Sequence, residues 1–294
     1  MKKKLIISDV TLRDGNHAVG HSISTDIIKK YCIEAEKAGI KIVEVGHGNG
    51  LGASSLSIGR SLAPDKLALA TARKNLKKTK LSIHSIPGFS RIDDLKMAID
   101  CGVDIFRIGT NATEIDTTYS QIKFCKKKKL EVWGVLMMAH LVYNKKKEYL
   151  KKIKYLVDQG VSTVIIMDSA GIFIPADIKE IFVNIKNNFN ISLGFHGHNN
   201  FGTAVWNSVV AVQNGANIID ASIKGFGAGA GNTQLDILTT VLEKLKITTN
   251  INLPELYSLA KIFPDFFKNK KIKYINPYAE PKNIMSANYG LFSG

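Results

Sequence analysis

The chain has few cysteines and no long apolar run, and both absences narrow what it can be. Its 294 residues include only three cysteines, odd in number and widely spaced: Cys32, Cys101 and Cys125. Neither a disulfide framework nor a cysteine-based zinc site is indicated, and a cytoplasmic location is expected. The apolar stretch after Lys4 is broken by Ser8 and Asp9. It is too short for a signal peptide, and no run elsewhere is long enough to span a membrane.

Arginine is scarce in a chain that is otherwise strongly basic. Forty lysines and arginines stand against 25 acidic residues, for a formal net charge of +15, yet only five of the 40 are arginines. Lysine is the weaker residue for bidentate recognition of phosphates or bases, and the lysine clusters contain no interleaved aromatic platforms. We therefore expect solvated helix faces, with neither a nucleic-acid nor a membrane partner. A non-catalytic basic binding protein is the alternative that the charge leaves open.

Short apolar segments alternate with amphipathic ones eight times along the chain. Strands are predicted at 5–8, 42–45, 81–86, 105–108, 132–138, 163–167, 192–195 and 218–222. Helices are predicted at 25–38, 64–76, 92–101, 119–128, 145–159, 176–187, 201–213 and 232–245. Apolar strands covered by helices favour a parallel sheet, and eight such units predict an α/β protein with a (β/α)8 barrel. A doubly wound sheet is disfavoured because the first strand–helix turn has no glycine-rich dinucleotide motif. We expect a catalytic barrel over 1–248 and a short C-terminal extension over 249–294.

Two histidines, His196 and His198, stand two residues apart at the end of the seventh predicted strand. In a strand this spacing points both side chains to one face, where two imidazole nitrogens suit Zn, Mn, Fe or Co. Asp14, after the first strand, is the carboxylate that would complete a site; an ordinary partly buried histidine pair is the alternative. A barrel collects its strand ends on one face, which favours the metal site. Other polar residues belong to the same rim: Arg13, His17, Glu44, His47, His140, Asp168 and Ser169.

Six segments, in order along the chain, resemble one known family. They are 9–17 (DVTLRDGNH), 44–51 (EVGHGNGL), 134–140 (GVLMMAH), 167–171 (MDSAG), 194–199 (GFHGHN) and 225–232 (GFGAGAGN). Together they are similar to the 4-hydroxy-2-oxovalerate (4-hydroxy-2-oxopentanoate) aldolases, within the superfamily of metal-dependent pyruvate aldolases and acyl-CoA lyases related to HMG-CoA lyase. The resemblance implies a metal-dependent (class II) aldolase that cleaves or forms 4-hydroxy-2-oxo acids, giving pyruvate and a short aldehyde through a pyruvate enolate.

The resemblance also implies which residues hold the metal and which act on the substrate. Asp14, His196 and His198 would bind a divalent cation, with manganese expected and magnesium, cobalt or zinc as alternatives. Arg13 would donate to the developing oxyanion and contact the substrate. Glu44 would orient Arg13, or the two would simply form an ion pair that braces the barrel mouth.

Four further positions follow from the family pattern, and three of them have a structural alternative. His17 is the expected catalytic base for the C4 hydroxyl, or else a residue that supports the metal ligands. Ser169 would bind the substrate carboxylate, or cap the next helix. Asn232 would lie near the metal and contact substrate, or cap the eighth helix. Tyr289 is matched to a tyrosine of the family that contributes to catalysis.

The chain departs from the family pattern at its C-terminus. Family members continue into a helical region that docks an acylating aldehyde dehydrogenase, whereas this sequence ends at Gly294. That partner is therefore doubtful, and the aldehyde half of the substrate is left open; a homo-oligomer is possible. The alternative enzyme is an HMG-CoA-lyase-like protein or an acyltransferase acting on acyl-CoA. Against it, residues 227–230 (GAGA) stand where HMG-CoA lyases carry a cysteine-bearing loop.

Overall fold

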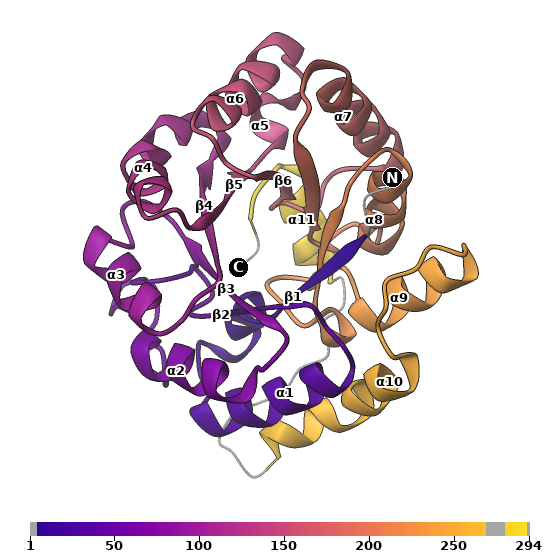
Figure 1. The fold of residues 1–294 in the computed structure, drawn as a ribbon. Helices are drawn as coiled ribbons and strands as arrows, with labels where there is room; N and C mark the ends of the chain where they lie inside the picture. The colour runs from indigo at the N-terminus through magenta and orange to yellow at the C-terminus, as the bar shows by residue number, and fades with distance from the viewer. Residues whose placement is uncertain (1–4, 269–279, 293–294) are drawn as a thin grey trace.

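Eight parallel strands close into a barrel in which each strand pairs with the next along the chain and β8 returns to β1. The computed structural model describes residues 5–268 and 280–292. Figure 1 looks along this barrel, with the helices arranged around the strands. The strands are β1 (Ile6–Leu12), β2 (Ile42–Val45), β3 (Lys80–Ser85), β4 (Ile105–Asn111), β5 (Glu131–Met137), β6 (Thr163–Asp168), β7 (Ser192–Gly197) and β8 (Ile218–Ala221). The predicted (β/α)8 barrel is confirmed.

All eight predicted helices are present. They are α1 (Thr25–Lys37), α2 (Asp65–Asn75), α3 (Ile92–Asp100), α4 (Tyr119–Lys127), α6 (Lys146–Asp158), α7 (Pro175–Asn188), α8 (Ala204–Gln213) and α9 (Leu235–Lys244). Three more helices were not predicted: α5 (His140–Tyr143), α10 (Leu253–Ile262) and α11 (Pro281–Asn288). Within the described residues there are also four 3₁₀ segments: η1 (Asp14–Val19), η2 (Ala112–Thr118), η3 (Ile223–Gly225) and η4 (Phe263–Phe267).

Strand β1 continues to Leu12, although the prediction ended it at Ser8. Polar Asp9 breaks the apolar pattern there, yet its carboxylate is buried and both of its oxygens accept hydrogen bonds. It accepts hydrogen bonds from the Tyr31 hydroxyl at 2.6 Å and from the Thr11 backbone N–H at 2.9 Å. A buried polar group with such partners is compatible with the interior of a strand. Hydrophobic periodicity alone does not identify such a residue as part of a strand.

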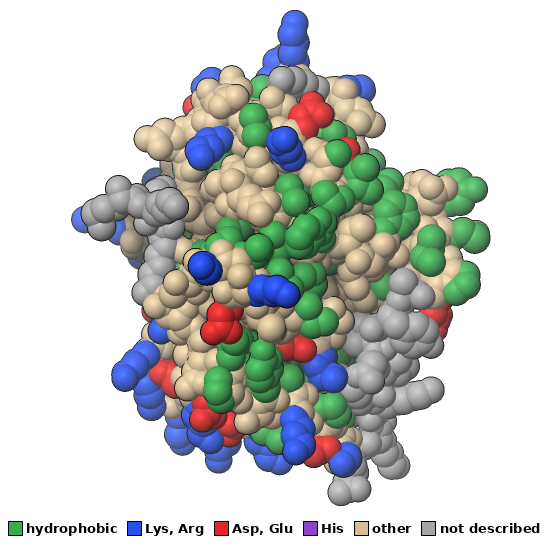
Figure 2. Space-filling model, turned by 90° about the vertical axis from the view of Figure 1, so that its right-hand side faces the viewer, with side chains coloured by type: hydrophobic (Ala, Val, Ile, Leu, Met, Phe, Trp, Pro, Cys, Tyr) green, Lys and Arg blue, Asp and Glu red, His purple; other side chains and the backbone are tan. Residues whose placement is uncertain are grey.

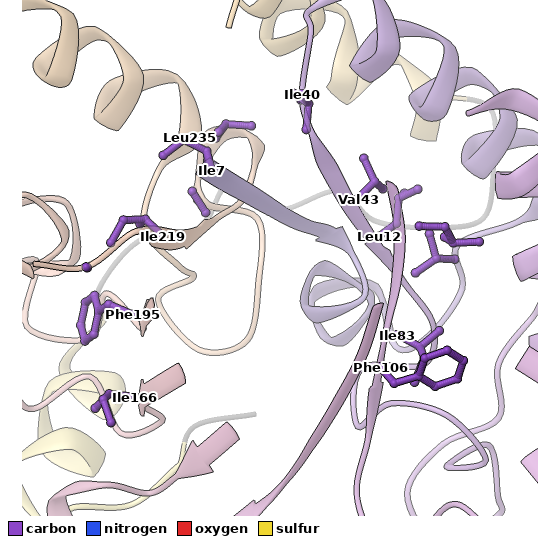
Figure 3. Packing of buried hydrophobic residues seen from close by; sticks show 14 of the residues in the cluster. Ile7, Leu12, Ile40, Val43, Ile83, Phe106, Ile166, Phe195, Ile219 and Leu235 are labelled. Atoms are coloured by element: carbon purple, nitrogen blue, oxygen red, sulfur yellow. The ribbon is translucent and has the colours of Figure 1, made fainter. Parts of the chain in front are cut away.

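The main core lies between the strands and the surrounding helices. Figure 3 shows some of its side chains, which come from the outward-facing positions of several strands and from adjoining segments. Nearly all of these apolar side chains are withdrawn from water, as in Ile7, Val43, Phe106, Phe195 and Ile219. Burial of apolar area on this scale stabilises the barrel and fixes which strand faces point inward.

The barrel interior changes from apolar to charged along its axis. An apolar group fills one level: Ile42, Ile105, Trp133, Ile165 and Ile218. Alternate residues of a strand share a face, so the residues two positions further on also point inward. On three of these strands those residues are charged: Glu44, Arg107 and Asp220, none of them exposed by more than 1%. This charged layer lies between the apolar interior and the strand ends.

The segment after the eighth helix folds back onto the barrel. Helix α10 lies beside α1 in Figure 1, and the Asn252 backbone N–H donates to the Ala38 carbonyl at 2.9 Å. Helix α11 is followed by a stretch that reaches the barrel mouth, where a hydrogen bond of 2.9 Å joins the Gly290 carbonyl to His140 Nε2. Residues after the predicted boundary at 248 therefore contribute to the rim.

Two surface properties bear on the expected partners. Over residues 5–268 and 280–292, no helix combines the length and apolar character needed to cross a bilayer. Figure 2 shows one side of the molecule, where basic side chains stand apart or alternate with acidic ones. Several lysines form ion pairs within their own helices, such as Lys154 with Asp158 at 2.7 Å. These pairs fit the expected solvated helix faces.

Candidate active site and metal centre

Three side chains from distant parts of the sequence meet at the strand ends. Asp14 begins η1 directly after β1, His196 lies in β7, and His198 follows that strand. The Nε2 atoms of the two histidines are 3.3 Å apart, and Asp14 Oδ2 lies 3.7 Å from His196 Nε2 and 4.0 Å from His198 Nε2. Each residue is at least 98% buried. In the described part of the chain this is the one group of three such side chains placed to share a cation.

The donor set fits a divalent metal. Two donors about 2.1 Å from one ion lie roughly 3.0–3.4 Å apart, as the histidine nitrogens do. Two imidazoles and one carboxylate leave further positions open for substrate or water. Next to them, both polar atoms of the Asn232 side chain are buried without a hydrogen-bond partner. Unpaired polar atoms at this depth are unfavourable unless something else occupies the site.

A glycine allows Asn232 and Asp14 to approach each other. A Cβ atom on Gly227 would lie 2.5 Å from Asn232 Nδ2 and 2.9 Å from Asp14 Oδ1, closer than real contacts permit. The next residue, Ala228, donates its backbone N–H to Asp14 Oδ1 at 3.1 Å. Helix α9 begins after Gln234, so Asn232 does not cap it. The structure places Asn232 beside the predicted ligands.

The electrostatics hold two of the ligands, Asp14 and His198, in the protonation states that a metal requires. Burial alone would raise the pKa of Asp14, but Arg13 and the nearby histidines outweigh it and hold that pKa well below its ordinary value. Burial lowers the pKa of His198 to about 3 despite the opposing effect of Asp14. An ionised carboxylate and a neutral imidazole both present a free electron pair to a cation.

Arg13 bridges the metal site and the charged layer. Its Nη1 donates to Asp14 Oδ2 at 2.5 Å, and its Nε forms an ion pair with Glu44. The predicted Arg13–Glu44 pair is therefore present. The remaining nitrogen, Nη2, is buried without a hydrogen-bond partner, and Arg13 lines the pocket. A guanidinium group held by two carboxylates, with one nitrogen still free, is placed to donate to a developing negative charge.

Two charged residues beneath the ligands were not among the predicted site residues. Arg107 on β4 forms an ion pair with Glu44 Oε2 at 2.5 Å and a second one with Asp220 on β8. Asp220 Oδ2 lies 3.0 Å from His196 Nδ1. Burial would raise the pKa of Asp220, but Arg107 and His196 lower it below its ordinary value. A signal existed in the sequence, because Arg107 and Asp220 each interrupt an apolar strand.

A pocket of about 540 Å³ opens above the ligands. Its lining includes Arg13, Asp14, His17, His84, Ser169, His198 and Phe292. The His17 ring packs over Gly48, where a Cβ atom would lie 2.5 Å from His17 Nε2. Burial lowers the pKa of His17, with partial compensation from Asp14, so this imidazole is neutral near pH 7. A neutral histidine at the pocket wall is able to accept a proton.

Ser169 lines the same pocket from the end of β6. Its hydroxyl oxygen accepts a hydrogen bond of 3.0 Å from the Met138 backbone N–H, which leaves the hydroxyl hydrogen available as a donor. The following helix, α7, begins after Ile174, so Ser169 does not cap it. The structure thus brings Ser169 to the pocket and does not support its alternative role.

Tyr289 lies outside this site. It follows the last residue of α11 with 72% of its surface exposed, and it does not line the pocket. Phe292, three residues later, takes the place predicted for it. The Phe292 ring centroid is 5.9 Å from that of His17 and 5.5 Å from that of His198. The chain turns at Gly290, which adopts a positive φ of 68°, and the catalytic role of Tyr289 stays a prediction.

A parallel eight-stranded barrel with buried Asp, His and His ligands at its strand ends defines the class: a metal-binding barrel with an active-site pocket. The family model described as HMGL-like matches residues 4–263. The chain belongs to this family and, within it, groups with the 4-hydroxy-2-oxovalerate aldolases. The family depends on a divalent metal, and Asp14, His196 and His198 form a possible site for one.

Two curated relatives and two solved structures illustrate the match. A 4-hydroxy-2-oxovalerate aldolase of Pectobacterium atrosepticum is 44% identical over 100% of this chain and 84% of its own length. That of Spirochaeta aurantia is 44% identical over 99% and 83%. The N-terminal domain of a putative aldolase from Bacteroides vulgatus superposes with a TM-score of 0.83 at 24% identity, covering 98% of this chain and 94% of that one. HMG-CoA lyase of Bacillus subtilis superposes with a TM-score of 0.74 at 20% identity, covering 98% and 100%; both structures establish the fold alone.

Proposed function

We propose that the chain is a divalent-metal-dependent aldolase that cleaves, or forms, 4-hydroxy-2-oxo acids, giving pyruvate and a short aldehyde. The observation that carries this proposal is the Asp14–His196–His198 group at the base of a pocket that Asp14, His198, Arg13 and His17 line. Its support from outside the structure is the 44% identity to 4-hydroxy-2-oxovalerate aldolases over nearly the whole chain.

Asp14, His196 and His198 would hold the metal in this scheme. When bound, the metal would supply positive charge that stabilises the negative charge developing on the keto oxygen of a 2-oxo acid as the carbon–carbon bond breaks. Arg13 donates from its unpartnered Nη2 to the same keto oxygen. Ser169 donates its hydroxyl hydrogen to the substrate carboxylate, and the Asn232 amide, whose polar atoms are unpaired beside the metal ligands, contacts the substrate.

His17 acts as the base on the C4 hydroxyl. Its neutral imidazole takes the hydroxyl proton, the C4–O bond becomes a carbonyl, and the C3–C4 bond breaks. The electron pair of that bond moves toward C3 and the keto oxygen, forming the enolate of pyruvate while the aldehyde leaves. Glu44 keeps the Arg13 guanidinium oriented toward that oxygen. A proton delivered to C3 then completes pyruvate.

A pyruvate-release assay tests the proposal. Purified protein is treated with EDTA and then assayed on 4-hydroxy-2-oxo acids of increasing chain length, with Mn²⁺, Mg²⁺, Co²⁺ or Zn²⁺ restored in turn. We expect pyruvate release only with a metal present, and fastest with Mn²⁺. Absence of pyruvate from every substrate with every metal would reject the proposed function.

Two finer assignments accompany the proposal. We propose manganese as the physiological metal, because the family pattern pairs Asp14, His196 and His198 with it. The reducing cytoplasm is the proposed compartment, supported by three cysteines that are free in the structure. Homo-oligomerisation stays a prediction, which sedimentation of the protein alone would test. An acylating aldehyde dehydrogenase is not proposed as a partner, and sedimentation of a mixture with such an enzyme would test this.

A further inference from the structure

The histidine ligand His196 is supported from behind by a buried carboxylate on the neighbouring strand. His196 and Asp220 are paired residues of β7 and β8, and Asp220 Oδ2 lies 3.0 Å from His196 Nδ1. A carboxylate can only accept, so Nδ1 carries the proton. In the neutral ring that metal binding requires, the other nitrogen, Nε2, is then the unprotonated one, and it faces Asp14 and His198. Only this tautomer of His196 can bind a metal at that position.

Asp220 is in turn held by a single arginine. Arg107 pairs with Asp220 through Nη2 and with Glu44 through Nη1, and the side chains of all three are 0% exposed. Its guanidinium carbon also lies 5.9 Å from the centre of the Trp133 ring. A planar guanidinium group can contact two carboxylates in fixed directions, which the point charge of a lysine cannot do. Arg107 therefore fixes the direction in which the Asp220 carboxylate faces.

We propose that Asp220, aimed by Arg107, is a positioning residue that sets the tautomer and ring orientation of His196 for metal binding. Neither residue touches the substrate or the metal position. The same guanidinium group contacts Glu44, which in turn contacts Arg13. Arg107 therefore links the support of the metal ligand His196 to the residue expected to stabilise the oxyanion. This inference rests on the metal site of the proposed function but not on which substrate that site cleaves.

Metal affinity measured without substrate tests the inference directly. Mn²⁺ is titrated into the EDTA-treated protein, and the free ion is followed by electron paramagnetic resonance. We expect Asp220→Asn to weaken Mn²⁺ binding about 10–100-fold, because an amide can donate to Nδ1 and stabilise the wrong tautomer. Arg107→Lys is expected to weaken binding by a smaller factor. The absorption spectrum of the Co²⁺-loaded protein should change in both variants, since it reports the geometry of the ligands.

Ser8→Ala is the matched control. Ser8 is the β1 residue paired with Asp220, it is 0% exposed, and its hydroxyl oxygen has no hydrogen-bond partner. Its replacement alters the same interior without touching the Arg107–Asp220–His196 chain, so Mn²⁺ affinity should stay at the wild-type value. Circular dichroism of each metal-free variant verifies that affinities are compared between folded proteins.

The double variant decides whether Arg107 acts through Asp220. If it does, Arg107→Lys combined with Asp220→Asn binds Mn²⁺ no more weakly than Asp220→Asn alone. Wild-type affinity in folded Asp220→Asn, or fully additive losses in the double variant, would overturn the inference. If the wild-type protein binds none of Mn²⁺, Mg²⁺, Co²⁺ or Zn²⁺, the metal site of the proposed function fails as well. Metal binding without aldolase activity would reject only the proposed reaction.

Discussion

At the scale of single residues, the guanidinium group of Arg13 is the feature from which the largest catalytic effect is expected. Arg13→Lys keeps the positive charge but loses the planar guanidinium group. In the wild type, this group contacts Asp14 and Glu44 through two nitrogens and leaves Nη2 without a partner. We expect kcat to fall about 10²–10³-fold, the usual cost of losing an oxyanion donor, with a smaller change in KM. Steady-state pyruvate release measures both constants.

Arg73→Lys is the control for that substitution. Arg73 also forms an ion pair, with Asp104 at 2.8 Å, but it does not line the pocket. Its replacement should leave kcat unchanged. An equal loss in both variants would mean that Arg13 acts only through stability.

The second residue-scale prediction separates Phe292 from Tyr289. Phe292→Ala removes the ring that contacts His17 and His198, so the base and one metal ligand gain freedom to move. We expect kcat/KM to fall on the order of tenfold, because catalysis is sensitive to small displacements of reacting groups. Tyr289→Ala, at an exposed position three residues earlier, should have no effect. A loss confined to the Tyr289 variant would restore that residue to the site.

Site residues could be predicted from the sequence where they belong to a recognisable motif. They could not be predicted where distant residues come into contact only in the folded structure. Arg13, Asp14, His17, Ser169, His196, His198 and Asn232 all reach the site, because each follows or ends a strand. Arg107 and Asp220 were missed although each is a charge within an apolar strand. Their pairing joins residues 113 positions apart, which spacing alone does not reveal.

At the scale of elements, the glycine-rich connection between β8 and α9 is predicted to control the metal site. Gly227→Ala would place a Cβ atom 2.5 Å from Asn232 Nδ2 and 2.9 Å from Asp14 Oδ1, so these side chains must move. We expect Mn²⁺ affinity to fall at least tenfold, comparable to the loss of a supporting contact at a metal site. Isothermal titration calorimetry with Mn²⁺ gives the affinity.

Gly202→Ala is the contrasting control. Gly202 has a positive φ of 72°, and a Cβ atom added there would meet nothing within 4 Å. Alanine at this position should lower the free energy of unfolding by about 1 kcal/mol because of backbone strain, while metal affinity is unchanged. Unchanged Mn²⁺ binding in Gly227→Ala would contradict the steric argument.

The presence of each strand and helix was easier to predict than the residues at which it begins and ends. Every predicted strand and helix is present, since apolar periodicity reflects burial against the barrel. The ends differ where polar groups are satisfied locally, as Asp9 is by Tyr31 and Thr11. Helices α10 and α11 were not predicted, because they lie outside the repeating pattern: α10 packs on α1, and α11 leads into the stretch that reaches the rim.

At the scale of the whole molecule, buried histidines couple stability to pH. Burial, followed by Arg13 and Arg107, holds the pKa of His84 well below its ordinary value of 6.5. Below pH 6.5 the unfolded chain therefore takes up a proton at this residue while the folded protein does not. The stability that neutral His84 contributes is present above pH 6.5 and decreases as the pH falls.

His84→Gln isolates this contribution, because glutamine does not titrate. Asp9 and Asp168, whose pKa values burial raises to about 6 and about 7, act in the opposite direction but cancel in the comparison. Relative to the variant, the metal-free wild type should lose up to about 1.4 kcal/mol per pH unit below pH 6.5. Urea unfolding at pH 5.0, 5.5, 6.0 and 7.5 measures the difference. A pH-independent difference would show that His84 titrates normally.

The charged layer inside the barrel has a consequence for the order in which ligands bind. The charged layer of Glu44, Arg107 and Asp220, taken together with Arg13 and Asp14 above it, holds two arginines and three carboxylates and therefore carries one negative charge in excess. A carboxylate substrate entering the empty barrel would meet repulsion in a region that screens charge poorly. A divalent cation reverses the sign, and a monoanionic 2-oxo acid then brings the total to zero. The metal should therefore bind first, and pyruvate should bind measurably only after it.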